Sequence, residues 1–470
     1  MVNYNGIVVS IKRAPDPRNN LYTIASTRVI NAKSSVLMEL CDSVEVDVED
    51  GAITGARILE KSTEEGALAR INELSAGLRI GVNAKKAVGA YAGRQYGEAL
   101  GRMEKPLEKA AAAFAGAYIS GAPIIVRFHH DGDGSSGAVS IYRALSKIAE
   151  SLMEGQRGVS WVMHKGVEYD RESFYSDTLE FRNYESVCKP VVLITDFGTA
   201  PGSEAQIAAL SESARLIMLD HHPVYDGFPK EKAASYINPW DYGSDTNFTA
   251  GLLASIFAEF IYTVDTEDMK AASLISDFSS FGDRSSKEGM RDAVILDYLT
   301  NISGRADSSI QKLTPSYIES ILMNREKADE VFYTASSAMD EMLDLGVKKA
   351  ESYNCSSGIT AFVLDFGTMP RASSGYPLPG RYSSRLQERL EGMNGKRTVT
   401  ILYYSGYVTM RVSKEVSKNV GILKMIDEIV ESSDYAESGG GHNEAASIKV
   451  SREHSKDVVD LVLTKLGASL

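Results

Sequence analysis

The histidines of this chain are few, and most of them stand in pairs. Four of the seven histidines in 470 residues form two adjacent pairs, at 129–130 and 221–222. The first pair opens the segment HHDGDG (129–134), and the second follows Asp220 directly. Carboxylates with one or two imidazoles suit divalent ions such as Mn²⁺ and Mg²⁺, and several carboxylates can hold two ions about 3.5–4 Å apart. The residue types therefore predict a metal site.

The elements expected before these segments would bring them together. Three apolar runs of strand length end directly in HHDGDG, in Asp196 and in Asp220. The strand-like runs, with a fourth further on, cover 123–128, 190–195, 215–219 and 235–238. Amphipathic segments that predict helices cover 137–154, 203–214 and 247–264. This alternation is typical of βαβ units around a largely parallel sheet, where side chains after the carboxyl ends of the strands gather in one crevice. We therefore expect one site.

The spacing within HHDGDG also favours ligation. Glycines at 132 and 134 allow a tight turn between ligands, and Asp131 and Asp133 lie two residues apart, so that each could meet one of two neighbouring ions. A single aspartate after a strand, such as Asp196, is more often a helix cap or turn residue. Two histidine pairs with acidic neighbours at strand ends favour metal binding over that interpretation.

The remaining regions differ in pattern. Residues 1–60 alternate short polar and apolar runs and predict a small antiparallel β module, followed by an Ala-rich helical segment over 61–118. Residues 315–352 carry apolar side chains at helical spacing and predict one long connecting helix. Residues 353–470 mix β-like runs with helices and predict a second, smaller α+β domain.

Composition excludes several classes of protein. With 43% hydrophobic and 24% charged residues, the chain has the composition of a soluble globular protein. Its most apolar stretch, 251–264, contains Glu259 and is too short to span a bilayer. Three well-separated cysteines form neither a disulfide framework nor a thiolate zinc site. The N-terminus lacks a secretory pattern, so we expect a cytoplasmic protein without membrane contact.

The charge distribution limits how a polyanion could bind. The net charge of -13 argues against coating of duplex nucleic acid by bulk electrostatics, but residues 358–470 carry 14 Lys/Arg against 13 Asp/Glu. In that lobe, SGGGH (438–442) could form a loop whose backbone N–H groups wrap an anion, and Arg411 could aim a guanidinium at a phosphate. Each feature alone is also typical of a flexible connector or an ordinary surface arginine.

In their order along the chain, these segments resemble the motifs of the DHH/DHHA1 phosphoesterases, and among them the RecJ-like nucleases of archaeal type. HHDGDG is similar to the first motif, Asp196 to the second, and the Asp-His-His at 220–222 to the triplet that names the family. SFGDR (280–284) resembles the fourth motif and GGGH (439–442) the mark of the DHHA1 domain.

The resemblance covers about residues 119–470 and implies an α/β fold. A parallel-sheet DHH catalytic domain over 119–314 would be joined by the helix at 315–352 to a DHHA1 substrate-binding domain over 353–470. The β-rich module at 1–60 would precede them.

The resemblance implies two ions, Mn²⁺ or Mg²⁺, that share Asp196. The metal ligands would be His129, Asp131 and Asp196 for one ion and Asp133, His221, Asp283 and Asp196 for the other. Asp283 is preferred to Asp277, six residues earlier, because its Gly-Asp-Arg context fits the motif better.

The remaining matching positions would serve the substrate. Asp220 would orient His221, while His222 would face the scissile phosphate. The residues that would hold a nucleotide phosphate are Arg411, Gly439, Gly440, Gly441 and His442.

The function implied first is a metal-dependent exonuclease that degrades single-stranded DNA or RNA in replication or repair. Its partners would be single-stranded nucleic acid and a replication or repair protein such as GINS or a Hef-type helicase. Two alternatives stay open. One is a phosphodiesterase or phosphatase for short oligonucleotides, cyclic dinucleotides or a nucleoside bisphosphate, and the other is a non-catalytic replisome scaffold.

Overall fold

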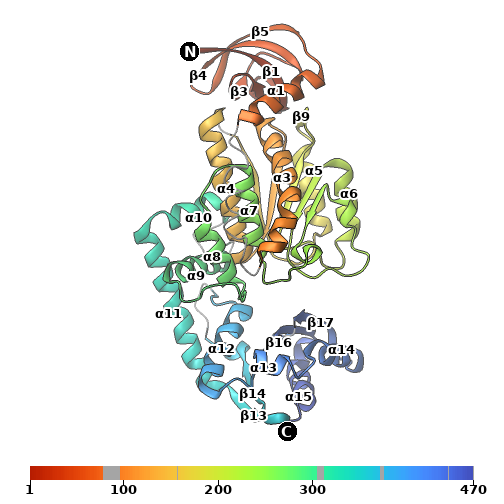
Figure 1. Ribbon diagram of the computed structural model, residues 1–470, viewed down its shortest axis with the longest axis vertical. Coiled ribbons are helices and arrows are strands. Elements are labelled where there is room, and N and C mark those ends of the chain that lie inside the picture. The colour runs from red at the N-terminus through yellow and green to blue at the C-terminus, as the bar shows by residue number, and fades with distance from the viewer. Residues whose placement is uncertain (78–95, 156, 304–311, 371–374, 443, 469–470) are drawn as a thin grey trace. The chain divides into compact units, whose positions relative to one another are not determined.

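The computed structural model describes residues 1–77, 96–155, 157–303, 312–370, 375–442 and 444–468. The chain divides into two compact units (Figure 1). The N-terminal unit comprises Met1–Thr300 and Lys312–Ala328, and the C-terminal unit comprises Asn301–Gln311 and Asp329–Leu470. In the described part of the chain, no helix is long and apolar enough to cross a membrane.

Five strands at the N-terminus form a closed barrel, where the sequence predicts a β-rich module. They are β1 (Val2–Lys12), β2 (Asn20–Ala25), β3 (Val29–Ser34), β4 (Asp42–Glu49) and β5 (Ala52–Lys61). Antiparallel pairs join β1 to β2 and β4, β2 to β3, and β4 to β5, while β3 and β5 pair in parallel. The strand order around the barrel is therefore β1-β2-β3-β5-β4, the arrangement of an OB-fold. Tyr22, Ile24 and Val46 are among the residues of its core.

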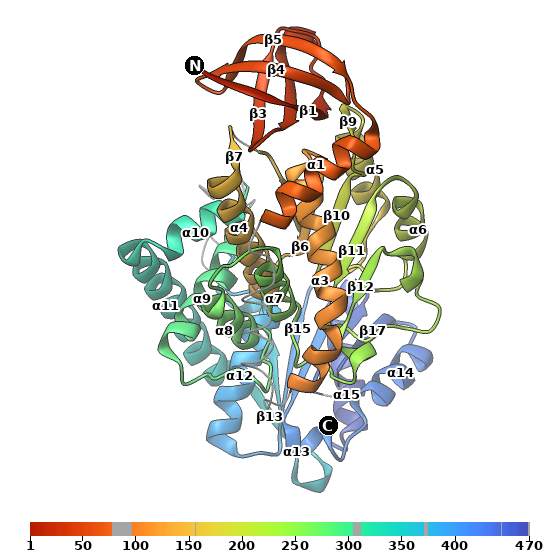
Figure 2. The same ribbon diagram turned by 45° about the horizontal axis from the view of Figure 1, so that its top comes forward.

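The barrel is joined to the rest of the N-terminal unit by shared strands and a shared core. β7 (Met153–Glu154) pairs with β3, and β9 (Tyr184–Ser186) pairs with β1. Val9, Ala25 and Val29 on the barrel pack into one cluster with α1 (Glu64–Gly77) and α3 (Gly97–Ile119). Figure 2 shows α1 directly below the barrel.

A parallel five-stranded sheet forms the centre of the N-terminal unit. In spatial order the strands are β12 (Ser235–Ile237), β11 (Arg215–Leu219), β10 (Val191–Thr195), β6 (Ile124–His129) and β8 (Ser160–His164). Every neighbouring pair is parallel. The mixed α/β fold with a parallel sheet is therefore confirmed.

Alternate residues of these buried strands face two layers of helices. Val126, Leu193 and Ile217 pack with α3, α4 (Gly132–Leu152) and α7 (Ala250–Ile261). Val192 and Ile194 pack on the other face with α5 (Arg171–Phe181) and α6 (Glu204–Ser213). Two further helices, α8 (Glu267–Ser276) and α9 (Lys287–Ile302), complete the layer beside α4.

The long helix expected over 315–352 is in fact two helices, α10 (Pro315–Leu322) and α11 (Arg325–Lys349). The amide of Met323 closes α10 on the Glu319 carbonyl, and the Asn324 side chain accepts the Lys327 amide at 3.1 Å. An asparagine in this position caps a new helix, because it satisfies an amide that has no partner within the helix. Apolar spacing alone does not reveal this break.

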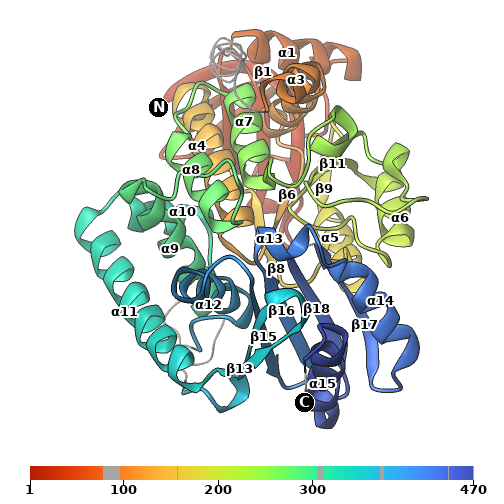
Figure 3. The same ribbon diagram turned by 60° about the horizontal axis from the view of Figure 1, so that its bottom comes forward.

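The C-terminal unit is built on a six-stranded sheet. In spatial order the strands are β13 (Glu351–Asn354), β14 (Thr360–Asp365), β15 (Thr398–Tyr404), β16 (Tyr407–Val412), β18 (Ala445–Val450) and β17 (Ala436–His442). One face packs with α12 (Pro379–Asn394), and the other with α14 (Ile422–Ser432) and α15 (Ser455–Lys465) (Figure 3). A one-turn helix, α13 (Lys414–Ser417), follows β16.

Candidate metal centre

The parallel register brings three segments to the same edge of the sheet. Thr195 at the end of β10 pairs with Phe128 on β6 and with Leu219 on β11. The residues that follow directly are His129, Asp196 and Asp220. Because all three strands run the same way, their next side chains lie together at the carboxyl edge.

The clustered side chains form groups whose ligand atoms lie within 4.8 Å of one another. The groups are His129/Asp131/Asp196, Asp133/His221/Asp277 and Asp196/Asp220/His221/His222. Asp196 reaches both histidines, since its Oδ2 is 3.6 Å from His129 Nδ1 and its Oδ1 is 3.3 Å from His221 Nε2. This carboxylate therefore lies between two groups of ligands.

Asp196 combines a buried, partly unbonded carboxylate with an unfavourable backbone conformation. Its side chain is only 2% exposed, and Oδ2 has no hydrogen-bond partner among the described residues. Its backbone has φ of +69°, a left-handed conformation that is unfavourable for a non-glycine residue. A buried carboxylate oxygen without a donor fits a bound cation.

Asp133 is fully buried at the N-terminus of α7. It accepts the amides of Ala250 and Gly251, each at 3.0 Å, and the hydroxyl of Ser273 at 2.5 Å. Burial, together with the carboxylates of Asp196 and Asp277, holds the pKa of Asp133 well above its usual range. Three carboxylates this close repel one another unless a cation lies among them, so the donor set fits divalent metal.

The imidazoles respond to the same carboxylates. Burial acts to lower the pKa of His129, but Asp131 at 3.0 Å and Asp196 outweigh it, so the pKa is raised well above its usual range. Burial also opposes protonation of His221, and hydrogen bonding to Asp196 likewise raises its pKa. A cation in place of these protons would make the same contacts with the carboxylates.

The structure places Asp277, and not Asp283, beside the clustered side chains. Asp277 follows α8, and its Oδ2 lies 3.9 Å from His221 Nδ1. Asp283 is exposed and belongs to none of the groups; it accepts the Ser285 amide at 2.9 Å and hydroxyl at 2.5 Å. Asp283 therefore closes a local turn, whereas Asp277 lies at the cluster.

The role expected for Asp220 also changes. Asp220 accepts from His222 Nδ1 and from the amide of His221, each at 2.8 Å, and from the Thr199 hydroxyl. His221 Nδ1 lies instead 2.9 Å from the Thr246 carbonyl, which leaves its Nε2 facing Asp196. Asp220 thus orients the ring of His222, and a backbone carbonyl orients that of His221.

Residues that hold the cluster in place were not predicted from the sequence. Asp297 on α9 accepts the amide of Gly132 at 3.1 Å and the hydroxyl of Ser276 at 2.8 Å, which fixes the turn after β6. A lone aspartate on an amphipathic helix carries no signal of this role. The Thr246 carbonyl carries none either, because every residue has a backbone carbonyl.

In the C-terminal unit, SGGGH forms part of the edge strand β17, not the expected loop. A Cβ at Gly439 would collide with Ile426 on α14, and one at Gly441 would collide with the Ala445 carbonyl, so these two glycines permit close packing. A Cβ at Gly440 would meet nothing within 4 Å.

Two positions expected to bind phosphate lie at one level of this sheet. Arg411 on β16 and His442 at the end of β17 both pair with Ala445 on β18, which runs between them. Arg411 donates from Nε to Ser384 Oγ at 2.9 Å and from Nη2 to the Gly380 carbonyl at 3.3 Å. The His442 side chain lies outside the described residues.

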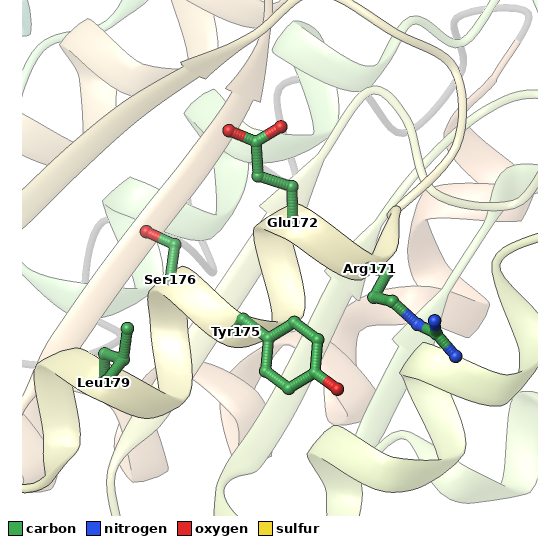
Figure 4. Close-up of a pocket in the computed structure, with 5 residues that line it drawn as sticks. All are labelled: Arg171, Glu172, Tyr175, Ser176 and Leu179. Carbon is green, nitrogen blue, oxygen red and sulfur yellow. The ribbon is translucent and has the colours of Figure 1, made fainter.

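A hollow unrelated to this chemistry lies along α5. Its lining residues, Arg171, Glu172, Tyr175, Ser176 and Leu179, all come from that helix (Figure 4). Tyr175 and Leu179 are 56% and 52% exposed. The hollow contains none of the clustered histidines or aspartates.

Comparison with solved structures identifies the fold. The DHH domain of a protein described as a member of a family of ribosomal proteins matches with a TM-score of 0.66 at 19% identity, over 85% of this chain and 97% of that one. The chain has a RecJ-like DHH fold. RecJ from Thermus thermophilus, solved with Mn²⁺, matches with a TM-score of 0.50 at 16% identity, over 84% of this chain and 60% of its own.

Sequence comparisons say less about this DHH-fold chain. No family model matches it. An uncharacterized protein of Methanocaldococcus jannaschii is 22% identical over 408 residues, and the match covers 75% of this chain. The alignment covers 52% of that relative, so the chain spans about half the length of the curated protein that it matches.

Proposed function

We propose that the protein is a metal-dependent phosphodiesterase that removes nucleotides from single-stranded DNA or RNA. The observation that carries this proposal is the position of Asp196, buried between the two histidines with one carboxylate oxygen toward each. A carboxylate shared in this way is the usual bridge of a two-metal hydrolytic site.

The proposed ligand sets follow from the groups. Asp196 would be common to both ions, and the additional ligands would be His129 and Asp131 for one ion and Asp133, His221 and Asp277 for the other. Mn²⁺ and Mg²⁺ both accept carboxylate oxygens, and the imidazoles favour Mn²⁺. When bound, two such ions activate a water molecule and offset the charge of a phosphate.

Among the described residues of the cluster, His222 is the one that we propose to meet the substrate. Its side chain is 40% exposed, and its Nδ1 is held by Asp220, so Nε2 is left for an outside acceptor. Burial acts to lower the pKa of His222, but Asp220 outweighs it and raises that pKa, which favours a protonated ring. A protonated imidazole donates to a phosphate oxygen and stabilises the negative charge that develops there.

In the C-terminal unit, the residues expected to bind phosphate are proposed to contact the nucleic-acid backbone. Arg411 and His442 share one level of the sheet, and the backbone of Gly439, Gly440 and Gly441 lies on its edge strand. The guanidinium and an exposed strand edge both offer donors for phosphate oxygens.

The experiment that tests the function is a Mn²⁺-dependent digestion of strands labelled at the 5′ or 3′ end, as DNA and as RNA, from dinucleotides to strands of several tens of nucleotides. Asp196→Ala is the control. Stepwise cleavage of long strands that disappears in Asp196→Ala supports the exonuclease and gives its direction. Cleavage of only the shortest strands indicates a small-substrate phosphodiesterase, and retained activity in Asp196→Ala contradicts the shared-ligand assignment.

A further inference from the structure

Trp240 is exposed at the same edge of the sheet as the metal centre. It lies in a short 3-10 turn, Pro239–Tyr242, that follows β12, and Ile237 of β12 pairs with Leu219 just before Asp220. The ring is 46% exposed. The chain has two tryptophans, and the other, Trp161 on β8, is half-buried against Tyr142. A large aromatic ring that stays accessible at this edge of the sheet, with its N–H already bonded, offers an apolar face to a ligand.

The ring is fixed to the two adjacent histidines through their backbone. Trp240 Nε1 donates to the His221 carbonyl at 3.0 Å. Asn238, fully buried, donates to the His222 carbonyl at 2.9 Å and accepts the Trp240 amide at 3.1 Å. One edge of the indole is thus held beside the His221-His222 segment, while nearly half of its surface stays open.

The chemistry of this surface fits a nucleobase. A rigid aromatic face stacks with any base, because every base has a π-face, and needs no sequence-specific hydrogen bond. Lys230 lies beside the same turn, with its Nζ 2.6 Å from Asp241 Oδ1 and 5.3 Å from the centre of the Tyr236 ring, so its charge is balanced by Asp241. An inorganic phosphate or pyrophosphate would gain nothing from the indole.

We propose that Trp240 is the stacking platform for the base of the nucleotide whose phosphate meets His222. This inference rests on the proposed function and deepens it, because it assigns the substrate to nucleotides and places one base beside the metal centre. The stacked base would hold its phosphate in place. Because any base can stack on the indole, discrimination among bases would be weak.

Two substitutions separate stacking from support of His221 by the indole N–H. Trp240→Phe keeps an aromatic face and removes the donor, whereas Trp240→Gln keeps a donor and removes the ring. Stacking predicts near-normal strand affinity in Trp240→Phe and a loss of about tenfold in Trp240→Gln. The reverse order, with Mn²⁺ affinity reduced in Trp240→Phe, would make Trp240 a positioning residue and overturn the proposal.

Fluorescence gives a readout that does not depend on hydrolysis. Trp161→Phe leaves Trp240 as the single tryptophan, and a base stacked on it quenches its emission. The probe is an unlabelled single strand in EDTA, compared with strands that carry one abasic site at successive positions. We expect saturable quenching that disappears when the abasic site reaches one particular position.

The outcomes distinguish this proposal from the function beneath it. Quenching without any Mn²⁺-dependent cleavage supports the base site and contradicts the hydrolase. Cleavage of a strand that never quenches Trp240 overturns the base site and leaves the hydrolase intact. Absence of both contradicts both.

Discussion

Asp196 illustrates how backbone strain at one residue can serve chemistry. Its left-handed φ costs about 1–2 kcal/mol for a residue with a Cβ. The conformation persists because the Asp196 amide donates to the Leu219 carbonyl at 3.0 Å and strands flank it on both sides. The result is a carboxylate directed between His129 and His221 instead of along the strand. Strain of this kind is retained where neighbouring structure enforces it.

Replacement of Asp277 by asparagine tests its proposed role as a metal ligand. Because Asp277 lies 3.9 Å from His221 and in the same group as Asp133, we expect Asp277→Asn to reduce Mn²⁺ affinity and hydrolysis by at least about tenfold. Calorimetric titration with Mn²⁺ and the strand digestion measure both. Asp283→Asn makes the same chemical change at an exposed turn and should leave both unchanged. The opposite pattern would return the role to Asp283.

The members of the cluster that could be predicted from the sequence are those that follow strands directly or within a few residues. Strand ends fix the direction in which His129, Asp196 and Asp220 leave the sheet, so apolar runs and parallel order suffice to bring them together. Asp277 and Asp283 instead lie in a connection after a helix, where a few backbone angles decide which carboxylate reaches the cluster. The sequence context favoured the one that the structure places in water.

The start of α7 is shaped around Asp133, one of the proposed metal ligands. Asp133 accepts two of its first amides, and the positive end of the helix dipole favours this buried carboxylate. Gly251 makes the approach feasible, because a Cβ there would lie 2.7 Å from Asp133 Oδ1 and would collide with Ser136. The N-terminus of α7 thus stabilises the Asp133 carboxylate, as a cationic side chain would in another site.

Gly251→Ala should therefore displace Asp133 and weaken Mn²⁺ binding by about tenfold or more. Titration of the variant with Mn²⁺ gives the affinity, and circular dichroism checks that the fold is kept. Gly116→Ala, in the interior of α3, is the matched control, because its Cβ would meet nothing within 4 Å. The control should gain roughly 0.5–1 kcal/mol of stability from helix propensity. Normal Mn²⁺ binding in Gly251→Ala would show that the helix start can shift without cost to the site.

A buried ion pair joins α7 to α8. Lys270 Nζ lies 2.6 Å from Glu259 Oε1, and the two side chains are 3% and 7% exposed. Lys270→Met leaves the Glu259 carboxylate buried without its cation, and we expect a loss of about 3 kcal/mol in unfolding free energy at neutral pH. Urea denaturation measures the loss, and the double variant Lys270→Met/Glu259→Gln should recover most of it.

The same variant should depend on pH in a defined direction. Burial already raises the pKa of Glu259, and removal of Lys270 raises it further. Because the folded-state pKa then lies above the unfolded value of about 4.3, the penalty is absent at lower pH and grows as pH rises through the folded pKa. A loss of unfolding free energy that is independent of pH would mean that methionine disturbs packing, and that the unpaired charge of Glu259 is not the cause.

The elements that escaped prediction share a physical cause. β17 has glycines at three successive positions, and it is a strand only because β18 pairs with it and α14 covers it. The break between α10 and α11 depends on one side-chain cap at Asn324. Runs of apolar residues such as VVLIT (191–195) or TVTILYY (398–404) can be predicted as strands from their own sequence. β17 and the helix break depend instead on contacts that the local sequence does not reveal.

The N-terminal barrel belongs to the same folded body as the parallel sheet. Its β1 and β3 pair with β9 and β7, and Val9, Ala25 and Val29 bury their side chains in the core shared with α3. β2 and β3 are almost wholly buried, although this is the face that OB-folds use for oligonucleotides. The exposed side of β4 carries Glu45, Asp47 and Glu49. The barrel is therefore better suited to support the parallel sheet than to guide a polyanion.

The charge of the whole chain predicts how strand binding responds to salt. A net charge of -13 gives no general attraction to nucleic acid, so affinity must come from a few local cations such as Arg411. Each phosphate neutralised on a single strand contributes about -0.7 to the slope of log affinity against log salt, so a few contacts give a slope of about -2. Fluorescence anisotropy of a labelled strand with the Asp196→Ala protein measures this slope across a KCl series.

Arg411→Gln should make the salt slope shallower by about 0.7. Arg397→Gln, which removes an exposed arginine paired with Glu415, should not change it. A slope steeper than about -4 would require more basic contacts than these and would move the strand to another surface.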